Sequence, residues 1–282
     1  MHIGRMRYAS IAGERVPVLG QGTWQLGDRP ERRAQEIATL QLGIDLGLTL
    51  IDTAEMYGSG ASERLVAEAI AGRRDQVFVV TKVLPGNAAR RQDIVAACER
   101  SLRNLGTDRI DLYLLHWRSG EDLPAVVDTF GELARAGKIR HWGVSNFDVD
   151  DLEELVGIAG GQAVASNQVL YNASRRGIEF DLLPLARERG LNIMAYTPIE
   201  PARLLRHRTL LDIAARHGAA AMAVALAWVT RGEGVLAIPR TGSPQHVREN
   251  ARALELELTA EDLRDIDQAF APPRRKRSLE MI

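Results

Sequence analysis

The chain has a single cysteine, Cys98, among its 282 residues. One thiol cannot form an internal disulfide or a cysteine metal cluster, and its scarcity is typical of a reducing compartment. An excess of charge of one sign is also lacking, because 36 Lys and Arg face 37 Asp and Glu. A formal net charge of −1 provides no global field for nucleic acid or an anionic membrane. We therefore expect neither as a partner, and an anionic ligand must be held by a local site.

Long apolar runs are lacking as well, although 45% of the residues are apolar and 26% are charged. That composition is typical of a globular chain with a large core. The longest apolar run, residues 219–229, is about half the length of a membrane-spanning helix, so we expect a buried helix there. Residues 1–5 have no apolar signal core. These features predict a cytoplasmic protein that does not enter a membrane.

Eight short apolar runs recur, at residues 18–24, 48–52, 77–82, 112–116, 142–145, 165–169, 192–196 and 235–239. Most are continuously apolar, which is typical of strands covered on both faces. The segments between them carry apolar side chains every three or four residues, as amphipathic helices do. This alternation predicts a single-domain α/β fold over residues 1–282, a (β/α)8 TIM barrel. An open doubly wound sheet is the alternative, but the absence of a Gly/Pro/Ser-rich linker favours closure.

The remaining segments predict additions to this barrel. Residues 8–17, with Gly13-Glu14 at the turn, are expected to form an N-terminal β-hairpin that plugs the barrel floor. Glycines are expected to end five of the helices, at Gly47, Gly106, Gly137, Gly190 and Gly232. Residues 271–282 should form a C-terminal tail near the barrel mouth, whose basic run at 274–277 is expected to be solvated.

Polar side chains close several predicted strands, at the end of the barrel where active sites of this fold lie. Asp52 ends the second strand, with Tyr57 in the loop that follows, and Lys82 and His116 end the third and fourth. Singly, each has a structural interpretation, as a helix cap, a rim aromatic, a snorkelling lysine or a core histidine. Together they supply a phenol, a Lys-Asp pair expected to lower its pKa, and an imidazole that can hydrogen bond a carbonyl oxygen.

Longer motifs contain these residues. They are Leu50-Ile51-Asp52-Thr53-Ala54-Glu55-Met56-Tyr57-Gly58, Thr81-Lys82, Leu114-Leu115-His116-Trp117, Gly143-Val144-Ser145-Asn146-Phe147, Asn167-Gln168-Val169-Leu170-Tyr171-Asn172 and Ile238-Pro239-Arg240-Thr241-Gly242-Ser243. In this order and at barrel spacing, the chain resembles the aldo-keto reductase superfamily over nearly its whole length. It looks most like short bacterial members that reduce methylglyoxal and other 2-oxoaldehydes. By contrast, Gly20-Gln21-Gly22 only mimics the start of a dinucleotide-binding fingerprint, because Gln25 stands where the third glycine belongs.

The resemblance implies NAD(P)H-dependent reduction of small aldehydes or ketones to alcohols, without metal or flavin. Tyr57 would protonate the carbonyl oxygen, with Lys82 and Asp52 tuning it. His116 would orient the substrate, and Trp24 and Trp117 would complete the substrate contacts. Ser145, Asn146 and Gln168 would hold the carboxamide of the cofactor, and Tyr196 would stack on its nicotinamide. The further cofactor contacts implied by the match are Gly22, Thr23, Asp52, Thr197, Pro198, Ile199, Arg240, Thr241, His246, Glu249 and Asn250.

The adenosine end of the implied cofactor site departs from the family pattern. Members that prefer NADPH commonly place a lysine and an arginine where this chain has Arg240 and His246. Arg240 can fork onto a 2′-phosphate, and Arg248 is a candidate to compensate for the histidine. These charges favour NADPH, with NADH as the alternative cofactor.

The cofactor loop departs from the pattern as well. Glu200 replaces the usual small residue near the pyrophosphate, and we expect it to turn outward or to pair with Arg203 or Arg206. Those arginines would then clamp the diphosphate or form a surface cluster.

Other functions stay open at this stage. Bulky Trp24 and Trp117 favour a small carbonyl substrate. An NADPH-binding sensor or regulatory subunit with slow turnover is one alternative. A barrel aldolase, in which Lys82 forms a Schiff base, is another. The oligomeric state is open, with a monomer as our expectation.

Overall fold

The computed structural model describes residues 6–200 and 204–282. Its main sheet holds eight parallel strands in the order β10-β9-β8-β7-β6-β5-β4-β3. Their bounds are β3 Gln21–Gly22, β4 Leu50–Asp52, β5 Phe78–Val83, β6 Ile110–Leu115, β7 Ile139–Ser145, β8 Ser166–Leu170, β9 Asn192–Tyr196 and β10 Val235–Ala237. Each lies within or beside one of the eight predicted apolar runs. The run at 18–24 is therefore a barrel strand and not the start of a dinucleotide-binding loop.

The sheet closes into a barrel because its two edges meet. Parallel bridges join Leu19 to Ala237 and Gly22 to Arg240, and the Gly22 N–H donates to the Pro239 carbonyl at 3.0 Å. A Cβ on Gly22 would lie 2.7 Å from the Ile238 carbonyl oxygen, so only glycine allows this approach. The predicted (β/α)8 barrel is thus confirmed.

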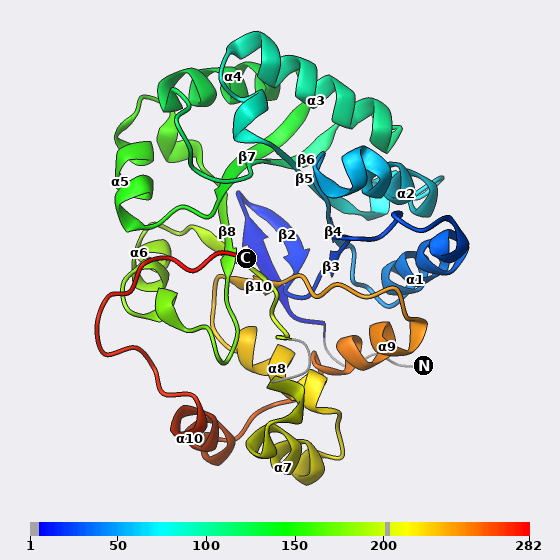
Figure 1. The fold of residues 1–282 in the computed structure, drawn as a ribbon, viewed down its shortest axis with the longest axis vertical. Helices are drawn as coiled ribbons and strands as arrows, with labels where there is room; N and C mark the ends of the chain where they lie inside the picture. The colour runs from blue at the N-terminus through cyan, green and yellow to red at the C-terminus, as the bar shows by residue number, and fades with distance from the viewer. Residues whose placement is uncertain (1–5, 201–203) are drawn as a thin grey trace.

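A ring of helices surrounds the strands (Figure 1). They are α1 Arg33–Asp45, α2 Ala61–Ala69, α3 Arg91–Leu105, α4 Leu123–Arg135, α5 Val149–Gly157, α6 Leu182–Glu188, α7 Arg208–His217, α8 Ala221–Val229, α9 Pro244–Arg252 and α10 Ala260–Ala269. The described residues also contain seven 3-10 turns between the strands and helices: η1 Pro30–Arg32, η2 Tyr57–Gly60, η3 Arg74–Gln76, η4 Pro85–Asn87, η5 Gly161–Ala163, η6 Gly177–Glu179 and η7 Leu204–Arg206. Helix α8 is buried, as its apolar run predicts.

Membrane-spanning length is not reached by any single helix in residues 6–200 and 204–282. Together α7 and α8 have the length and composition for a span, but they are bent by 97° relative to each other.

Glycine ends most of the predicted helices, and Gly106 (φ 60°) is the left-handed C-cap of α3. Gly232 was expected to do the same and does not. Helix α8 stops at Val229, and the left-handed residue in the turn before β10 is Gly234 (φ 73°). Two glycines so close together leave the sequence ambiguous about which one turns the chain.

An N-terminal hairpin, β1 (Tyr8–Ile11) paired with β2 (Glu14–Pro17), fills the barrel floor. Ile11 and Val16 are buried in one cluster with inward side chains of the barrel strands, among them Leu50 and Leu112. The turn differs from the expectation by one residue, because Ala12 and Gly13 (φ 47° and 87°) make it and Glu14 already pairs in the strand. Two consecutive left-handed residues match the twist of a two-residue hairpin loop.

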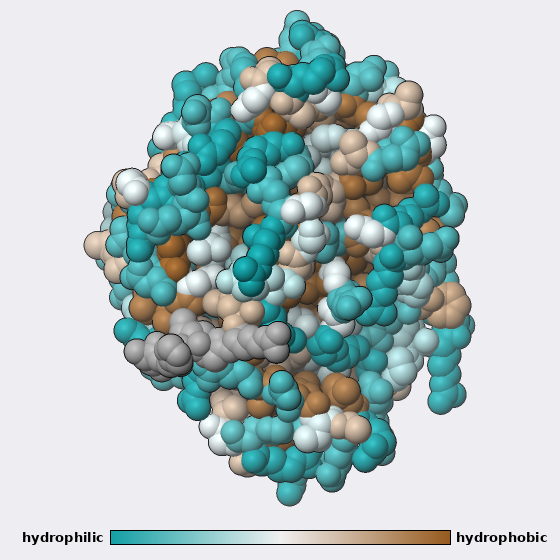
Figure 2. Space-filling view, turned by 180° about the vertical axis from the view of Figure 1, so that it is seen from behind, coloured by the Kyte–Doolittle hydropathy of each residue, from teal (hydrophilic) through white to brown (hydrophobic). Residues whose placement is uncertain are grey.

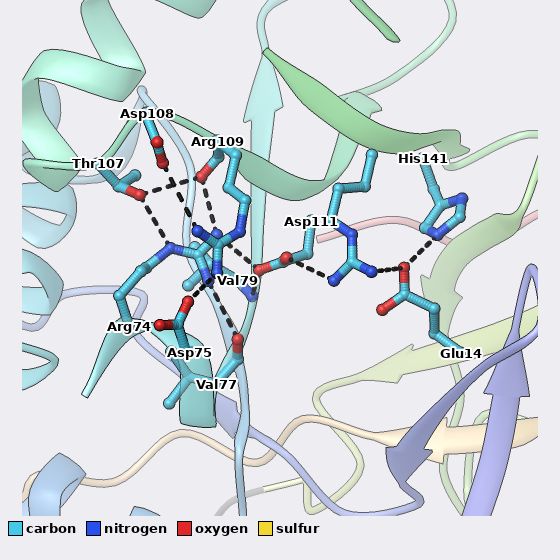
Figure 3. A network of polar contacts seen from close by, with 11 residues as sticks. Glu14, Arg74, Asp75, Val77, Val79, Thr107, Asp108, Arg109, Asp111 and His141 are labelled. Atoms are coloured by element: carbon cyan, nitrogen blue, oxygen red, sulfur yellow. Dashed lines mark hydrogen bonds and ion pairs between the residues drawn. The ribbon is translucent and has the colours of Figure 1, made fainter. Parts of the chain in front are cut away.

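Ion pairs fasten this hairpin to the barrel (Figure 3). Asp111, which is buried, receives the Arg74 guanidinium at 2.8 Å and that of Arg140 at 3.5 Å. Arg140 also reaches Glu14 of the hairpin at 2.8 Å, and the His141 ring nitrogen lies 2.6 Å from the same carboxylate. The hairpin is therefore held both by apolar packing and by charge.

The opposite end of the barrel carries the C-terminal tail. It leaves α10, passes α6 and ends over the centre of the barrel (Figure 1). The predicted position of the tail is thus the one that the structure shows.

Seen from behind, hydrophilic side chains cover most of the molecule, with apolar ones scattered between them (Figure 2).

Candidate active site

Three side chains from neighbouring strand ends meet at the barrel mouth. Lys82, fully buried at the end of β5, lies 2.8 Å from Asp52 at the end of β4. Its ammonium also donates to the Thr53 carbonyl at 2.8 Å and to the Tyr57 hydroxyl at 3.3 Å. All three N–H groups of the lysine are therefore used, and one of them is aimed at the phenol.

The electrostatics of this group hold Lys82 charged. Burial alone would lower the pKa of its ammonium, but the charges of Asp52 and Tyr57 and the hydrogen bonds to both raise that pKa. Gln168 from β8 donates its amide N–H to the Asp52 carboxylate at 2.7 Å. This last contact was not expected from the sequence, because 116 residues separate the partners. Gln168 itself is buried.

Tyr57 behaves differently from the expectation that its pKa is lowered. Burial raises the pKa of the phenol, and the Lys82 charge opposes this shift without overcoming it, while Asp52 adds to it. The prediction of a lowered pKa is wrong because it weighed the neighbouring ammonium and could not weigh desolvation. The consequence is that Tyr57 keeps its proton at neutral pH and is a hydrogen-bond donor.

His116 lies beside Tyr57, with 5.9 Å between the ring centroids and the planes nearly perpendicular. Burial and then the Lys82 charge lower the pKa of its imidazole to about 3, so the ring is neutral. Its Nδ1 is buried without a hydrogen-bond partner among the residues that the structure describes. A buried nitrogen without a partner costs less free energy when it carries no proton. The ring therefore favours the tautomer with the proton on Nε2.

The loop that carries Tyr57 is anchored by Glu55. This carboxylate accepts from the Leu84 N–H at 2.8 Å, the Asn87 amide at 2.9 Å and the Arg100 guanidinium at 2.7 Å. Three donors from the next loop and helix thus fix the backbone two residues before Tyr57. No motif in the sequence indicates this role of Glu55, although a carboxylate beside apolar residues is a signal that it has polar partners.

Side chains at the ends of β7, β8 and β9 form a second polar group. Ser145 donates to the Gln168 carbonyl at 2.8 Å, and the Tyr196 hydroxyl donates to the Asn146 amide oxygen at 2.9 Å. Asn146 and Thr197 both have left-handed backbones, with φ of 58° and 47°. Such strain in non-glycine residues is concentrated at functional sites. The structure therefore brings together the residues expected around a nicotinamide.

A cavity of about 440 Å³ opens next to the end of β10. Arg240, Thr241, Ser243 and His246 line one wall of it. Asn250, on α9, is buried, and its amide oxygen has no hydrogen-bond partner in the described part of the chain. Glu249 accepts from Gln245 at 2.9 Å. A cationic cavity near an unpaired amide oxygen fits the phosphate and adenine of a dinucleotide.

Two further implied cofactor residues are buried. Thr23 donates its hydroxyl to the Asp52 carbonyl at 2.9 Å, and Gly22 pairs with Asp52 in the parallel register of β3 and β4. Pro198 is buried and Ile199 half-buried in the segment after β9. The backbone N–H groups of both are used within the barrel, that of Gly22 by the Pro239 carbonyl and that of Thr23 by the Asp52 carbonyl at 3.0 Å each.

Glu200 has partners other than those expected. It pairs with Arg175 at 3.2 Å and accepts a hydrogen bond from Ser174, and no contact joins it to Arg206 within the described residues. Arg203 lies outside those residues. The expectation of Arg206 as partner is wrong because Ser174 and Arg175, in the loop after β8, supply the contacts to Glu200 instead.

Arg175 also joins the tail. Its guanidinium lies 3.1 Å from Glu280. At the end of the tail, the backbone of Ile282 hydrogen bonds Tyr196. Burial raises the pKa of this phenol to about 12, and the hydrogen bond opposes the rise. One arginine therefore links the loop after β9 to the tail over the mouth.

Aromatic and apolar side chains rim the mouth. Trp24 is 52% exposed and Met56 41% exposed. Trp117 is half-buried, with its ring 5.0 Å from that of His116. Among the described residues no group of His, Cys, Asp and Glu has the arrangement to hold a metal ion.

Comparison with known proteins identifies the family. The model for the aldo/keto reductase family matches residues 18–271. The chain belongs to the aldo/keto reductase family. This reductase is 46% identical over 272 residues to methylglyoxal reductase YeaE of Escherichia coli K12, covering 95% of each chain.

Solved structures agree with this assignment. An aldo/keto reductase from Klebsiella pneumoniae in complex with NADP and acetate is 43% identical, with a TM-score of 0.96 over 99% of this chain and 100% of that one. A structure from the same organism in complex with NADPH gives the same values. The aldo/keto reductase barrel and its hairpin are thus shared with proteins that bind this nucleotide.

Proposed function

We propose that this aldo/keto reductase uses NADPH to reduce small aldehydes and ketones, with 2-oxoaldehydes such as methylglyoxal preferred. The observation that carries the proposal is Tyr57 held beside the buried Lys82-Asp52 pair and His116. The nucleotide bound by the Klebsiella relatives and the cavity beside Arg240 support NADPH. The activity named for the Escherichia coli relative supports the substrate class. Because one chain supplies all these residues, we propose that a monomer suffices.

When bound, NADPH supplies the hydride for the carbonyl carbon. Ser145, Asn146 and Gln168 would hold its carboxamide, and Tyr196 would stack on its nicotinamide. Arg240, Thr241 and His246 would hold the phosphate end, and Asn250 would receive the adenine.

Tyr57 donates its proton to the carbonyl oxygen. The oxygen acquires negative charge as the carbon accepts the hydride, and the phenol proton neutralises it, which leaves an alcohol and a Tyr57 phenolate. The Lys82 ammonium stabilises this phenolate until water returns the proton. A neutral His116 donates from Nε2 to the same oxygen and fixes the carbonyl.

The same geometry argues against an aldolase. A Schiff base requires a neutral amine with room for a substrate carbonyl. Lys82 is fully buried, donates to three acceptors, and has a raised pKa. We therefore assign it to the support of Tyr57.

Oxidation of NADPH, followed by absorbance, tests the proposal. Methylglyoxal, phenylglyoxal, simple aldehydes, aldoses and diketogluconate are offered in parallel, and the series is repeated with NADH. We expect fast turnover with 2-oxoaldehydes and NADPH. Tight NADPH binding without turnover on any carbonyl would overturn the proposal in favour of a sensor.

A further inference from the structure

The cavity beside Arg240 has a second wall that the family resemblance does not assign. Arg32, the last residue of η1, and Gln35 on the first turn of α1 line this wall. It faces the segment between β10 and α9. Helices α1 and α9 lie side by side in the ring (Figure 1).

Hydrogen bonds fix the two walls relative to each other. The Gln35 side chain donates to the Gly242 carbonyl at 2.8 Å, and the Thr39 hydroxyl lies 3.3 Å from the same oxygen. Gly242 is adjacent to Thr241, which lines the first wall. The position of Arg32 across from Arg240 is thus built into the contact between α1 and this segment.

The guanidinium groups of both arginines are free for an anion. Arg240 uses its Nε to donate to the Trp24 carbonyl at 2.9 Å, which leaves its terminal nitrogens. Arg32 is exposed and has neither an ion pair nor a side-chain hydrogen bond with any residue in 6–200 or 204–282. Its neighbour Arg33, in contrast, pairs with Glu68.

One carboxylate also lines the cavity and offsets part of this positive charge, which leaves the two arginines in excess. Glu36 is buried and accepts from the Gly27 N–H at 2.8 Å. Arg248, the side chain expected to compensate for His246, is not part of the lining and donates to the Pro244 carbonyl at 3.3 Å. The cavity therefore presents two arginines from opposite walls.

We propose that Arg32 is the second cation for the 2′-phosphate of NADPH and determines the preference for NADPH over NADH. The inference rests on the proposed use of NADPH. Relatives that prefer NADPH commonly have an arginine where this chain has His246. Arg32 would supply that positive charge from the other side of the cavity, just before α1. Two guanidinium groups on a phosphate form charge-assisted hydrogen bonds, the strongest class in proteins.

The experiment measures binding without turnover. NADPH and NADH are titrated into wild type and Arg32→Ala, following nucleotide fluorescence, with 2′,5′-ADP and 5′-ADP as competitors. We expect Arg32→Ala to weaken NADPH and 2′,5′-ADP about tenfold, the lower end for a charge-assisted bond to an exposed arginine. Affinity for NADH and 5′-ADP should change by less than about twofold, because neither carries the 2′-phosphate.

Arg29→Ala is the matched control, because Arg29 is an exposed arginine of the same loop that does not line the cavity. It removes the same charge and should leave the NADPH to NADH ratio unchanged. Arg32→Gln keeps most of the side-chain volume and should behave as Arg32→Ala does. Equal weakening of NADPH and NADH, unchanged NADPH affinity, or the same loss in Arg29→Ala would each overturn the assignment. A failure of the proposed reaction looks different, since NADPH would bind with the Arg32 dependence but would not be oxidised.

Discussion

At the scale of single residues, the side chains with proposed chemical roles lie at the ends of neighbouring parallel strands. Asp52, Lys82 and His116 end neighbouring strands of a parallel barrel, so their meeting follows from the pattern alone. The direction of the Tyr57 pKa shift does not follow, because it depends on how much water the folded loop excludes. The partners of Glu55 and Gln168 lie on other strands and loops, and no spacing rule indicates them.

Replacing Tyr57 by Phe removes the proton donor and also the acceptor of one Lys82 N–H. We expect Tyr57→Phe to bind NADPH with unchanged affinity and to lose turnover by about two to four orders of magnitude, the usual contribution of a general acid. Nucleotide titration and steady-state reduction of methylglyoxal measure the two quantities. Turnover close to wild type would contradict the role of Tyr57.

The pH dependence of reduction follows from the same residues. The pKa of His116 is lowered to about 3, so the ring stays neutral, and that of Tyr57 is raised, so the phenol stays protonated. We expect kcat for reduction to be flat from about pH 5 to about pH 9 and to fall only above about pH 10, as Tyr57 loses its proton. A decline centred between about pH 6 and pH 7 would mean that His116 carries the charge.

At the scale of elements, continuous apolar runs were reliable because strands covered on both faces leave little ambiguity. The hairpin was predicted with its turn one residue late, since Ala12 adopts a left-handed backbone that favours glycine. The sequence does not predict that Arg32 and Arg240 line one cavity, because only closure of the barrel brings the loops after β3 and β10 together.

The link between the loop after β9 and the tail is testable through Arg175. We expect Arg175→Ala to raise KM for the carbonyl about three- to fivefold with little change in kcat, because Glu200 and Glu280 then repel and the tail loosens. The modest size reflects the exposure of the pair. Arg208→Ala, which breaks the exposed pair with Asp212, is the control and should change neither constant. A fall in kcat at constant KM in Arg175→Ala would contradict a role of Arg175 in positioning the tail.

At the scale of the molecule, the chain divides stability and chemistry between the two ends of the barrel. The hairpin, with Ile11 buried in the lumen, lies at the end opposite to Tyr57 and Lys82. We propose that all 282 residues form one domain. Alternation of strands and helices predicted the barrel, whereas the ion pairs of the floor depend on which charged side chains the closed sheet brings together.

Ile11→Ala separates these two ends. We expect it to lower the free energy of unfolding by about 2–4 kcal/mol, the cost of a large-to-small change in a core. The kcat should remain unchanged, because the hairpin does not reach the mouth. Urea unfolding and methylglyoxal reduction measure the two effects. Tyr8→Ala, on the exposed face of the same strand, is the control and should cost less than about 1 kcal/mol.

Because the hairpin closes one end of the barrel, nucleotide and carbonyl would both enter through the mouth at the other end. If Tyr196 stacks on the nicotinamide as proposed, the ring would lie below the exposed side chains of Trp24 and Met56, and a carbonyl bound over the ring would block its way out. We therefore expect ordered binding, with the nucleotide entering before the carbonyl and leaving after the alcohol, and with release of NADP⁺ as a slow step of the cycle.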